Sequence, residues 1–342
     1  GRAGGWAAAA SGVAARTAPV HPDPKVPGMA ASCGPSRARG MGPAPPYGRS
    51  PMIVTGHRPG IGKLRRDPRK DAQRRGRAMI AILGTGKMGE ALLSGLLRAG
   101  RSPDEIVATA RRPERAEALR KRYGVRMLGN AEAAREAETI ILAVKPQDMD
   151  RLLSEIASCD LADKLVISVA AGITTAFIQA RLGEVPVVRV MSNTPVLVDE
   201  AMSVISPGAH ATEEHLKRTE ELLSPVGKVV RIPESLQDAA TALSGSGPAY
   251  FFYLVEAMVD AGILLGMPRA AALEMVTQAM VGAAIMLRDS GEHPVSLREA
   301  VTSPGGTTIA AIAELERHRV RAAFLDAIEA ACNRSRELAS GR

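Results

Sequence analysis

MIAILGTGKMGEALLSGLLRAG, residues 79 to 100, is the stretch that decides the fold of this chain. Its first five residues are all apolar, which is typical of a strand buried on both faces of a parallel sheet. From Met88 onward the apolar residues follow helical spacing, and Gly100 predicts the end of the helix. The stretch therefore predicts a strand, a glycine turn and a helix.

Three glycines in the turn, Gly84, Gly86 and Gly89, form the pattern G-x-G-x-x-G. In such a unit the first glycine allows the tight turn, the second lets the backbone approach a pyrophosphate, and the third lets the helix pack on the strand. The helix N-terminus then faces the anion. The pattern alone is weak, and a glycine-rich turn in another βα unit is the alternative. The strand before it and the helix after it favour dinucleotide binding.

Strands and helices alternate from residue 79 to residue 235. Apolar runs predict further strands at 106–109, 139–144, 165–169, 185–191, 203–206 and 228–232. Helical spacing predicts helices at 113–123, 148–157, 174–182 and 212–223. This alternation is typical of an α/β fold, and it predicts a Rossmann-like, doubly wound parallel sheet in a domain spanning 79–235.

Residues 236–342 show no strand pattern and predict an all-helical second domain. The expected helices lie at 235–243, 248–265, 269–289, 296–303, 307–316 and 320–338. Several are apolar around much of their circumference, as at 249–265 and 270–287. A domain of roughly 100 residues can hardly bury so much apolar surface alone. We therefore expect a dimerisation domain in which a second copy supplies the missing burial.

Residues 1–78 have a different composition. They hold 15 basic and three acidic residues, whereas the rest of the chain holds 29 basic and 33 acidic ones, so the net charge of +8 belongs to this segment. Its richness in Gly, Pro, Ala and Arg predicts a disordered basic tail. A transit peptide and a nucleic-acid-binding arm are alternatives. We favour a natural start at Met79, with the tail coming from an over-extended reading frame.

The sequence gives little support to metal binding or membrane insertion. Its three cysteines are far apart and in no metal spacing, which fits a reduced cytoplasm. The apolar stretch 249–265 carries Glu256 and Asp260, and each costs about 2.5 kcal/mol or more at a bilayer centre. We therefore expect no metal and no membrane, and interpret this stretch as a buried or interface helix.

The end of the second predicted strand indicates which dinucleotide is bound. An acidic residue about 20 positions beyond the glycines binds the ribose of NAD, whereas arginine accommodates the 2′-phosphate of NADP. Here Arg111 and Arg112 occupy this place, and the first carboxylate is Glu114. NADPH is therefore favoured. If the two arginines are only a solvated pair, NADH is usable as well.

Two segments of the helical part have sequences that packing alone does not explain. LSGSGP, residues 243–248, either caps a helix that Pro248 opens, or lets the backbone approach a substrate between the domains. VTSPGGTT, residues 301–308, presents the amides and hydroxyls of Thr307 and Thr308 at a helix start behind two glycines. That arrangement suits a carboxylate, although an ordinary interhelical turn has the same pattern.

Taken together, the motifs resemble the pyrroline-5-carboxylate reductase family over residues 79 to about 338. The shared segments are AILGTGKMG at 81–89, AVKP at 143–146, AAG at 170–172, NTP at 193–195, LSGSGPAY at 243–250 and AVTSPGGTT at 300–308. The last motif matches the family signature and is specific. One departure is Ser192, where many members have proline, and we expect little consequence.

The resemblance implies the NADPH-dependent reduction of 1-pyrroline-5-carboxylate to L-proline, the final step of proline biosynthesis, in the cytoplasm. It also implies a homodimer intertwined through the helical domain, often assembled further into a decamer, with no nucleic acid as partner. A protonated imine is already electrophilic, so hydride transfer needs alignment more than a strong base.

The resemblance also implies the site residues. The pyrophosphate would lie on Leu83, Gly84, Thr85, Gly86, Lys87, Met88 and Gly89, and the 2′-phosphate near Arg111 and Arg112. The rest of the dinucleotide would contact Asn130, Ala143, Val144, Lys145 and Pro146, with Val169, Ala170 and Ala171 on the nicotinamide side. The substrate would be bound by Ser303, Thr307 and Thr308. Thr308 is the expected catalytic residue, because its hydroxyl would meet the ring nitrogen and relay a proton.

Two rival functions remain open. A β-hydroxyacid dehydrogenase shares this layout but uses a lysine at the domain boundary. The last lysine here is Lys228 and no histidine lies between His215 and His293, which counts strongly against alcohol oxidation. The other rival is an idle protein that binds NADP or nucleic acid, and its binding to nucleic acid would depend steeply on salt.

Overall fold

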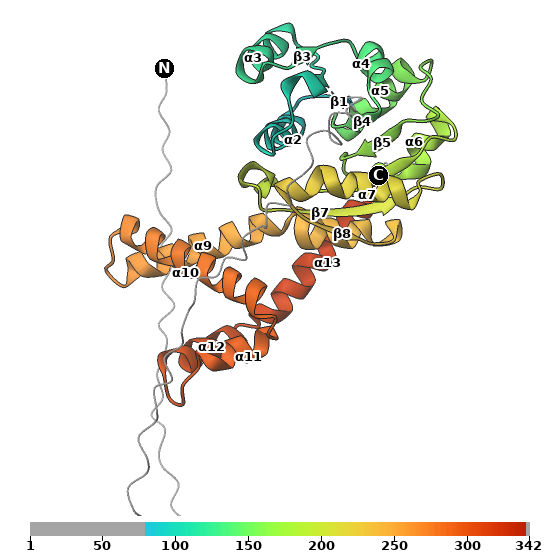
Figure 1. Ribbon diagram of the computed structural model, residues 1–342. Coiled ribbons are helices and arrows are strands. Elements are labelled where there is room, and N and C mark those ends of the chain that lie inside the picture. Colours follow the sequence, from blue (N-terminus) through green and yellow to red (C-terminus); the bar gives the residue numbers. More distant parts are fainter. Residues whose placement is uncertain (1–78, 340–342) are drawn as a thin grey trace, which may run out of the picture. The chain divides into compact units, whose positions relative to one another are not determined.

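The structure is a computed structural model that describes residues 79–339 (Figure 1). The expectation of a disordered tail concerns residues 1–78, which lie outside the described residues. Within the described part, a single sheet of eight strands has the order β3-β2-β1-β4-β5-β6-β7-β8. The strands are β1 Ile80–Leu83, β2 Ile106–Ala108, β3 Arg126–Met127, β4 Thr139–Leu142, β5 Leu165–Ser168, β6 Val187–Met191, β7 Ala201–Pro207 and β8 Gly227–Arg231.

The strand order reverses beside β1. The chain moves outward from β1 to β2 and β3, then returns to β4 on the other side of β1 and continues through β5 and β6. In an open α/β sheet this reversal places a ligand crevice at the carboxyl ends of the strands next to it. The fold therefore puts the glycine turn after β1 at the mouth of such a crevice.

Helices cover both faces of the sheet, as the doubly wound prediction requires. The first face is covered by α2 (Lys87–Arg98), α3 (Pro113–Tyr123) and α7 (Glu213–Leu223), which bury Leu92, Leu119 and Leu222. The second face is covered by three other helices, α4 Asn130–Glu136, α5 Met149–Ile156 and α6 Thr175–Leu182. The residues of β1 are 0–1 % exposed, because this strand is packed from both sides.

The sheet differs from the wholly parallel prediction at one pairing. β7 runs antiparallel to β6, and β8 is parallel to β7, so these two strands oppose the other six. Parallel neighbours need a crossover of a dozen or more residues. The segment from β6 to β7 holds only the short helix η3 (Thr194–Val198), so the chain can only fold back on itself.

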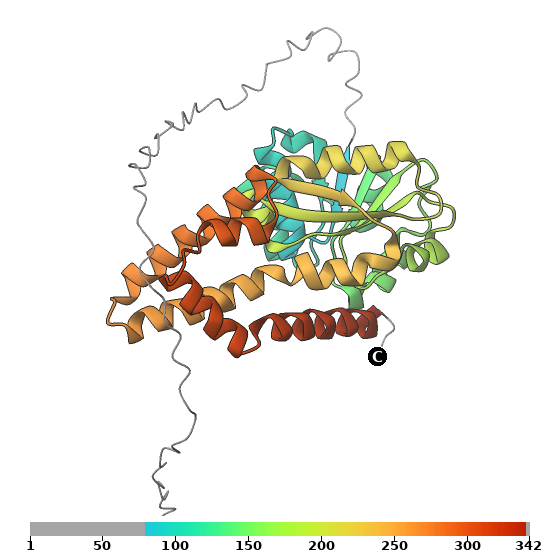
Figure 2. The same cartoon turned by 90° about the horizontal axis from the view of Figure 1, so that it is seen from below.

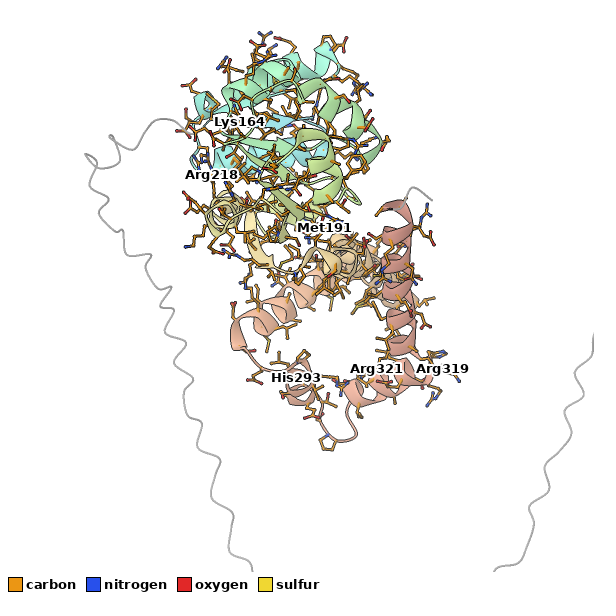
Figure 3. The ribbon with its side chains drawn as sticks, turned by 90° about the vertical axis from the view of Figure 1, so that its right-hand side faces the viewer. Lys164, Met191, Arg218, His293, Arg319 and Arg321 are labelled. Atoms are coloured by element: carbon orange, nitrogen blue, oxygen red, sulfur yellow. The ribbon has the colours of Figure 1, made fainter. Side chains whose placement is uncertain are left out.

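Two elements of the sheet region were absent from the sequence prediction. The strand β3 is two residues long, and the helix α4 that follows it is seven residues long. Lys164 extends to the C-terminal end of α4, where its Nζ donates to the carbonyl oxygens of Ala134, Arg135 and Ala137 at 2.9, 2.6 and 2.8 Å (Figure 3). These bonds satisfy carbonyls that the helix itself leaves unpaired.

The remainder of the described chain is helical. Its elements are α8 Gln237–Ala240, the π-helix η6 Thr241–Gly245, α9 Gly247–Leu264, α10 Arg269–Ser290, α11 Pro294–Ala300, α12 Thr307–Arg317 and α13 Val320–Ala339. α9 and α10 form an antiparallel pair whose close approach leaves Gly262 against Ala272, and α13 returns toward the sheet (Figure 2). Phe251, Phe252 and Tyr253 on α9 remain 57–76 % exposed.

Candidate active site

The glycine turn follows β1 and has the geometry that the motif predicts. Gly84 has a φ of +95°, which L side chains rarely adopt. A side chain on Gly89 would collide with the carbonyl oxygen of Gly84, so the third glycine is needed for helix α2 to pack on the strand. A Cβ on Gly86 would meet nothing within 4 Å. The backbone at Gly86 is therefore open to a ligand.

The end of β2 holds this turn in place. The amide of Thr85 donates to the carbonyl oxygen of Thr109 at 2.9 Å, and the Thr85 hydroxyl donates to the same oxygen at 2.8 Å. The amide of Gly84 donates to Oγ1 of Thr109 at 3.0 Å. Both threonines are 3–4 % exposed. Thr109 therefore fixes the shape of the turn, a role that the sequence analysis did not assign to it.

A cavity of about 880 Å³ opens at this turn, at the carboxyl ends of β1, β2 and β4. It brings together nine of the residues predicted to bind the dinucleotide. These are Gly84, Thr85, Gly86, Arg111, Arg112, Asn130, Ala143, Val144 and Lys145. The predicted residues that do not line it are Leu83, Lys87, Met88, Gly89, Pro146, Val169, Ala170 and Ala171.

The cavity also includes residues that the sequence analysis missed. Arg115 comes from the first turn of α3, Gln147 and Asp148 come from the short helix η2 (Pro146–Asp148), and Arg151 and Glu155 come from α5. Arg151 and Glu155 are four residues apart, so they share one face of α5. The spacing could have predicted that these two side chains lie together. It could not have predicted that they line this cavity.

Arginines line the edge of the cavity beside β2. Arg111 and Arg112 are exposed, and Arg115 Nε donates to the carbonyl oxygen of Thr85 at 3.3 Å. Arg115 also forms an ion pair with Glu90, which accepts a further bond from the Tyr123 hydroxyl at 3.0 Å. Burial alone would raise the pKa of Glu90, but the bonds from Arg115 and Tyr123 outweigh it and leave the pKa below its usual value.

The residues present fit a dinucleotide phosphate. An open glycine backbone at a helix N-terminus offers amide donors to an anion, and arginines at the end of β2 offer positive charge. The first carboxylate after β2 is Glu114, as the sequence indicated. Among residues 79–339 no group of three or more His, Cys, Asp or Glu residues could hold a metal ion.

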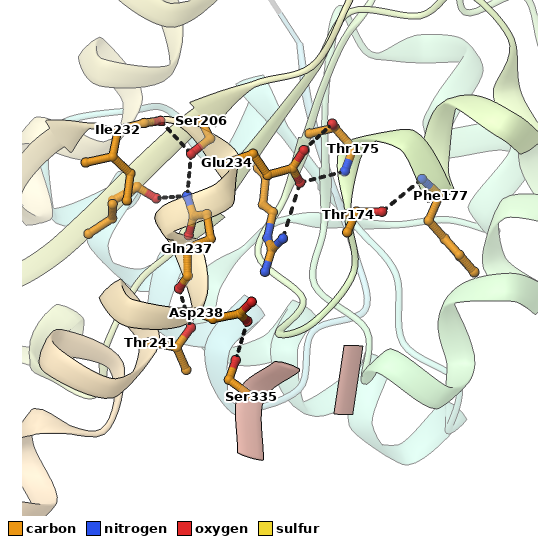
Figure 4. A network of polar contacts seen from close by, with 12 residues as sticks. Thr174, Thr175, Phe177, Ser206, Ile232, Glu234, Gln237, Asp238, Thr241 and Ser335 are labelled. Atoms are coloured by element: carbon orange, nitrogen blue, oxygen red, sulfur yellow. Dashed lines mark hydrogen bonds and ion pairs between the residues drawn. The ribbon is translucent and has the colours of Figure 1, made fainter. Parts of the chain in front are cut away.

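Beyond the cavity, a partly buried network ties the start of α6, which follows β5, to Glu234, just before the helical region (Figure 4). Glu234 accepts from the amide of Thr175 at 2.8 Å, from the Thr175 hydroxyl at 2.6 Å and from Arg189 at 3.2 Å. Arg189 is only 3 % exposed. Glu234 therefore fixes the end of the loop that carries Val169, Ala170 and Ala171, the residues predicted for the nicotinamide side.

The segment LSGSGP lies where the sheet meets the helices. Residues 241–245 form a π-helix, and α9 begins at Gly247 with Pro248 in its first turn, as predicted. Asn193 Nδ2 donates to the carbonyl oxygen of Ser244 at 3.1 Å, and Met191 packs against Gly245 (Figure 3). Ser246 makes no capping bond with its side chain, so the capping interpretation of this serine fails.

The predicted substrate loop is formed but lies apart from the cavity. Gly305 has a φ of +66°, and α12 begins at Thr307 as expected. Ser303 and Thr307 are exposed, and Thr308 is half-buried. None of the three lines the cavity, and Figures 1 and 3 show α11 and α12 extending away from the sheet. One copy of the chain therefore does not unite the two predicted halves of the site.

Helix α10 raises the question of membrane insertion, which the sequence analysis considered only for residues 249–265. Among the described residues it is the one helix long and apolar enough to cross a membrane, judged by length and composition alone, and 6 % of its apolar window is buried. The same features suit a helix covered by another copy of the chain.

A mostly parallel sheet with a G-x-G-x-x-G turn at its ligand crevice, joined to a separate set of apolar helices, is typical of a nicotinamide-dependent oxidoreductase of the Rossmann class. Comparison with known proteins identifies the family. Residues 234–338 match the model for pyrroline-5-carboxylate reductase dimerisation, and residues 79–172 match that for NADP oxidoreductase, coenzyme F420-dependent.

Named relatives agree with these matches. The chain is 45 % identical to the pyrroline-5-carboxylate reductase of Corynebacterium melassecola over 264 residues, which cover 76 % of this chain and 98 % of the relative. It is also 45 % identical to that of Methanosarcina acetivorans over 262 residues, covering 76 % and 97 %. The chain therefore belongs to the pyrroline-5-carboxylate reductase family.

Solved structures support the same assignment. The pyrroline-5-carboxylate reductase of Coxiella burnetii aligns with a TM-score of 0.73 at 34 % identity, covering 77 % of this chain and 98 % of the other. The Plasmodium falciparum pyrroline carboxylate reductase, solved with NADP bound, aligns with a TM-score of 0.70 at 28 % identity over the same shares. The predictions of the family, the fold class and an oxidoreductase are confirmed.

Proposed function

We propose that this chain reduces 1-pyrroline-5-carboxylate to L-proline in the cytoplasm, with NADPH as the preferred donor, and that its active form is a homodimer. The reaction is the one named for its relatives, and the observation that carries it is the cavity at the open backbone of Gly86. The bound dinucleotide would supply the hydride, and the imine carbon of the substrate would accept it.

The sheet region, residues 79–235 in our division, would hold the dinucleotide. The turn from Leu83 to Gly89 would bind the pyrophosphate through its amides, because a Cβ at Gly86 would meet nothing and a phosphate oxygen can approach. Arg111 and Arg112 would bind the 2′-phosphate, for which guanidinium groups are suited. NADH, which lacks this phosphate, would bind more weakly.

The helical region, residues 236–342, would bind the substrate. The amides and hydroxyls of Thr307 and Thr308 at the start of α12, with Ser303 beside them, suit a small carboxylate. The Thr308 hydroxyl would hydrogen-bond the ring nitrogen and position the imine for hydride transfer. Since these residues do not line the cavity of their own chain, we assign this contribution to the second copy.

The dimer itself follows from unburied apolar surface. Phe251, Phe252 and Tyr253 on α9 and Met275 and Met286 on α10 are all more than half exposed in a single chain. Burying one such side chain stabilises an assembly by about 1.5–3 kcal/mol. A helix pair from the partner would cover these faces. We therefore explain the exposed apolar surface of α10 by dimerisation and not by membrane insertion. A decamer of such dimers is the larger assembly to look for.

The test is NADPH oxidation by the purified full chain, with and without 1-pyrroline-5-carboxylate. We expect oxidation that depends on the substrate and gives one proline per NADPH consumed. Light scattering on the same sample should give a mass of at least two chains. A chain that binds NADPH but leaves it unoxidised in the presence of the substrate would refute the proposed reaction. A monomer with full activity would refute the proposed dimer.

A further inference from the structure

A carboxylate lines the same cavity as the arginines that follow β2. Asp148 Oδ1 lies 3.6 Å from Nη1 of Arg111 and 3.4 Å from Nη2 of Arg151. All three residues line the cavity. Arg111 follows β2, whereas Asp148 and Arg151 belong to η2 and α5, which follow β4. The Arg111–Asp148 ion pair therefore links the segment after β2 to the segment after β4 at this cavity.

Neighbouring residues on α5 and α4 hold Asp148 in this position. Arg151 contacts Asp148 and also pairs with Glu155 at 3.7 Å, and Glu155 accepts from Asn130 Nδ2 at 2.6 Å. The Asp148 side chain is 29 % exposed, and the Arg111 side chain is 73 % exposed. Arg111 is thus the more exposed partner, and an ion pair this exposed is easily displaced by a stronger ligand.

Asp148 is the acidic residue that pairs with Arg111, one of the two arginines proposed for the 2′-phosphate. Within residues 79–339 the Arg111 side chain has no other ion pair or hydrogen bond, and the Arg112 side chain has none. Arg115 is committed to Glu90 and to the carbonyl oxygen of Thr85. Whatever binds beside Arg111 must therefore share it with Asp148 or take it away.

The two dinucleotides differ at this point. A phosphate monoester carries a charge of about −1.5 to −2 near pH 7, so it competes with Asp148 for Arg111 and is repelled by its carboxylate. A ribose hydroxyl is neutral and can donate a hydrogen bond to a carboxylate, which is how an acidic residue after the second strand recognises NAD in this fold. Asp148 supplies such a group from η2.

We propose that Asp148 sets the choice between the two donors. It supplies, from the β4 side of the cavity, the carboxylate that the end of β2 lacks, so it favours NADH and limits the preference for NADPH. This inference rests on the proposed function, because it places the 2′-position of the dinucleotide beside Arg111.

The experiment compares Asp148→Asn with the unchanged full chain by isothermal titration calorimetry with NADPH and with NADH. Removing one negative charge near a solvated phosphate should tighten NADPH binding about fivefold, and NADH binding should weaken or stay the same. The NADPH effect should shrink as salt is raised, because ions screen the repulsion. Adenosine 2′,5′-bisphosphate against AMP should repeat the difference without nicotinamide.

Asp150→Asn is the matched control. Asp150 lies two positions further on, pairs with Arg181 on α6 and does not line the cavity. Its removal should leave the ratio of NADPH to NADH affinity unchanged. Asp148→Ser is a second variant that removes the charge with a different shape, and thermal melts of all three confirm folding.

Equal changes in the affinities for both dinucleotides, or none, overturn the inference. A shift in the ratio toward NADH also overturns it. A chain that binds both dinucleotides but leaves 1-pyrroline-5-carboxylate unreduced refutes the proposed reaction, while the Asp148 comparison still gives its result. A chain that binds neither dinucleotide overturns both.

Discussion

In a single copy of this chain the sheet region buries its apolar residues, whereas the helical region leaves many of its apolar residues exposed. β1 is 0–1 % exposed, and the cavity beside it brings together nine of the residues predicted to bind the dinucleotide. On α9, by contrast, Phe252 is 66 % exposed and Tyr253 76 % exposed, and the predicted substrate loop stands away from that cavity. One copy thus offers a cavity for the dinucleotide, whereas we propose that the catalytic site needs two copies.

The largest expected effect comes from Phe252→Glu, which places a charge on the exposed face of α9. If a second copy covers this face, an unpaired charge there would be buried at a cost of several kcal/mol. We expect a monomer that has lost reductase activity and still binds NADPH. Analytical ultracentrifugation and calorimetry measure the two properties separately.

Val230→Glu provides the control for that change. Val230 is 45 % exposed on β8, in the sheet region. A new charge there should leave the dimer intact. Dissociation of both variants to the same degree would mean that apolar exposure alone does not mark the interface.

The next effect is that of Thr308→Ala. Removing a hydrogen bond made chiefly in the transition state should lower kcat about 100-fold, with a far smaller effect on the affinity for NADPH. Equal and small effects on both would contradict the assigned role. The measurement is steady-state kinetics beside calorimetric titration.

Mixed dimers sharpen this test. Gly86→Trp should block the dinucleotide site, because the open backbone at Gly86 faces the cavity. Chains carrying Thr308→Ala and chains carrying Gly86→Trp should each be inactive alone. If the two halves of a site come from different copies, co-expressed mixed dimers regain activity. No recovery would place both halves in one chain.

The sequence was most informative for features that residues close together in the chain determine. The turn from Gly84 to Gly89 and the starts of α9 and α12 could be predicted, because glycine, proline and apolar spacing act within a few residues. β3 was missed because two residues show no periodicity. The reversed direction of β7 was missed because the segment after Met191 was assigned no element and hence no crossover length.

The lining of the cavity shows a different limit. Thr109, Asp148 and Arg151 come from three segments that meet only after the sheet has formed. The spacing of these residues along the chain does not predict that they come together. In the same way, no pattern within one copy shows which residues of a second copy complete the site, so the place of Thr308 in the dimer remains a prediction.

Replacing Arg111 and Arg112 together by alanine tests the nucleotide half alone. Removal of the positive charge should lower the NADPH to NADH ratio of kcat/KM about tenfold, and the dimer should persist. An unchanged ratio would count against a 2′-phosphate beside β2. The comparison with Asp148→Asn is direct, since the two changes should move the ratio in opposite directions.

Thr109→Val should have a more moderate effect, confined to the sheet region. It removes the hydroxyl that accepts from the amide of Gly84 and leaves that donor without its bond, at a cost of about 1–3 kcal/mol in stability. We expect weaker binding of both dinucleotides with no change in their ratio, measured by calorimetry and thermal melts. Thr109→Ser, which keeps the hydroxyl, should restore most of the loss.

The smallest expected effect is the pH dependence of the link between α2 and α3. Because Glu90 has a lowered pKa in the folded chain, its contribution to stability is complete above the unfolded value of 4.5 and is lost as the pH falls through the folded value. Glu90→Gln should therefore be less stable than the unchanged chain at pH 7, and the difference should shrink below pH 4.5. Urea titrations across this range measure it. A difference that stayed constant into acid would mean that the Glu90 carboxylate is not held by Arg115 and Tyr123. The sheet region would then be less completely tied together within one copy than its burial indicates.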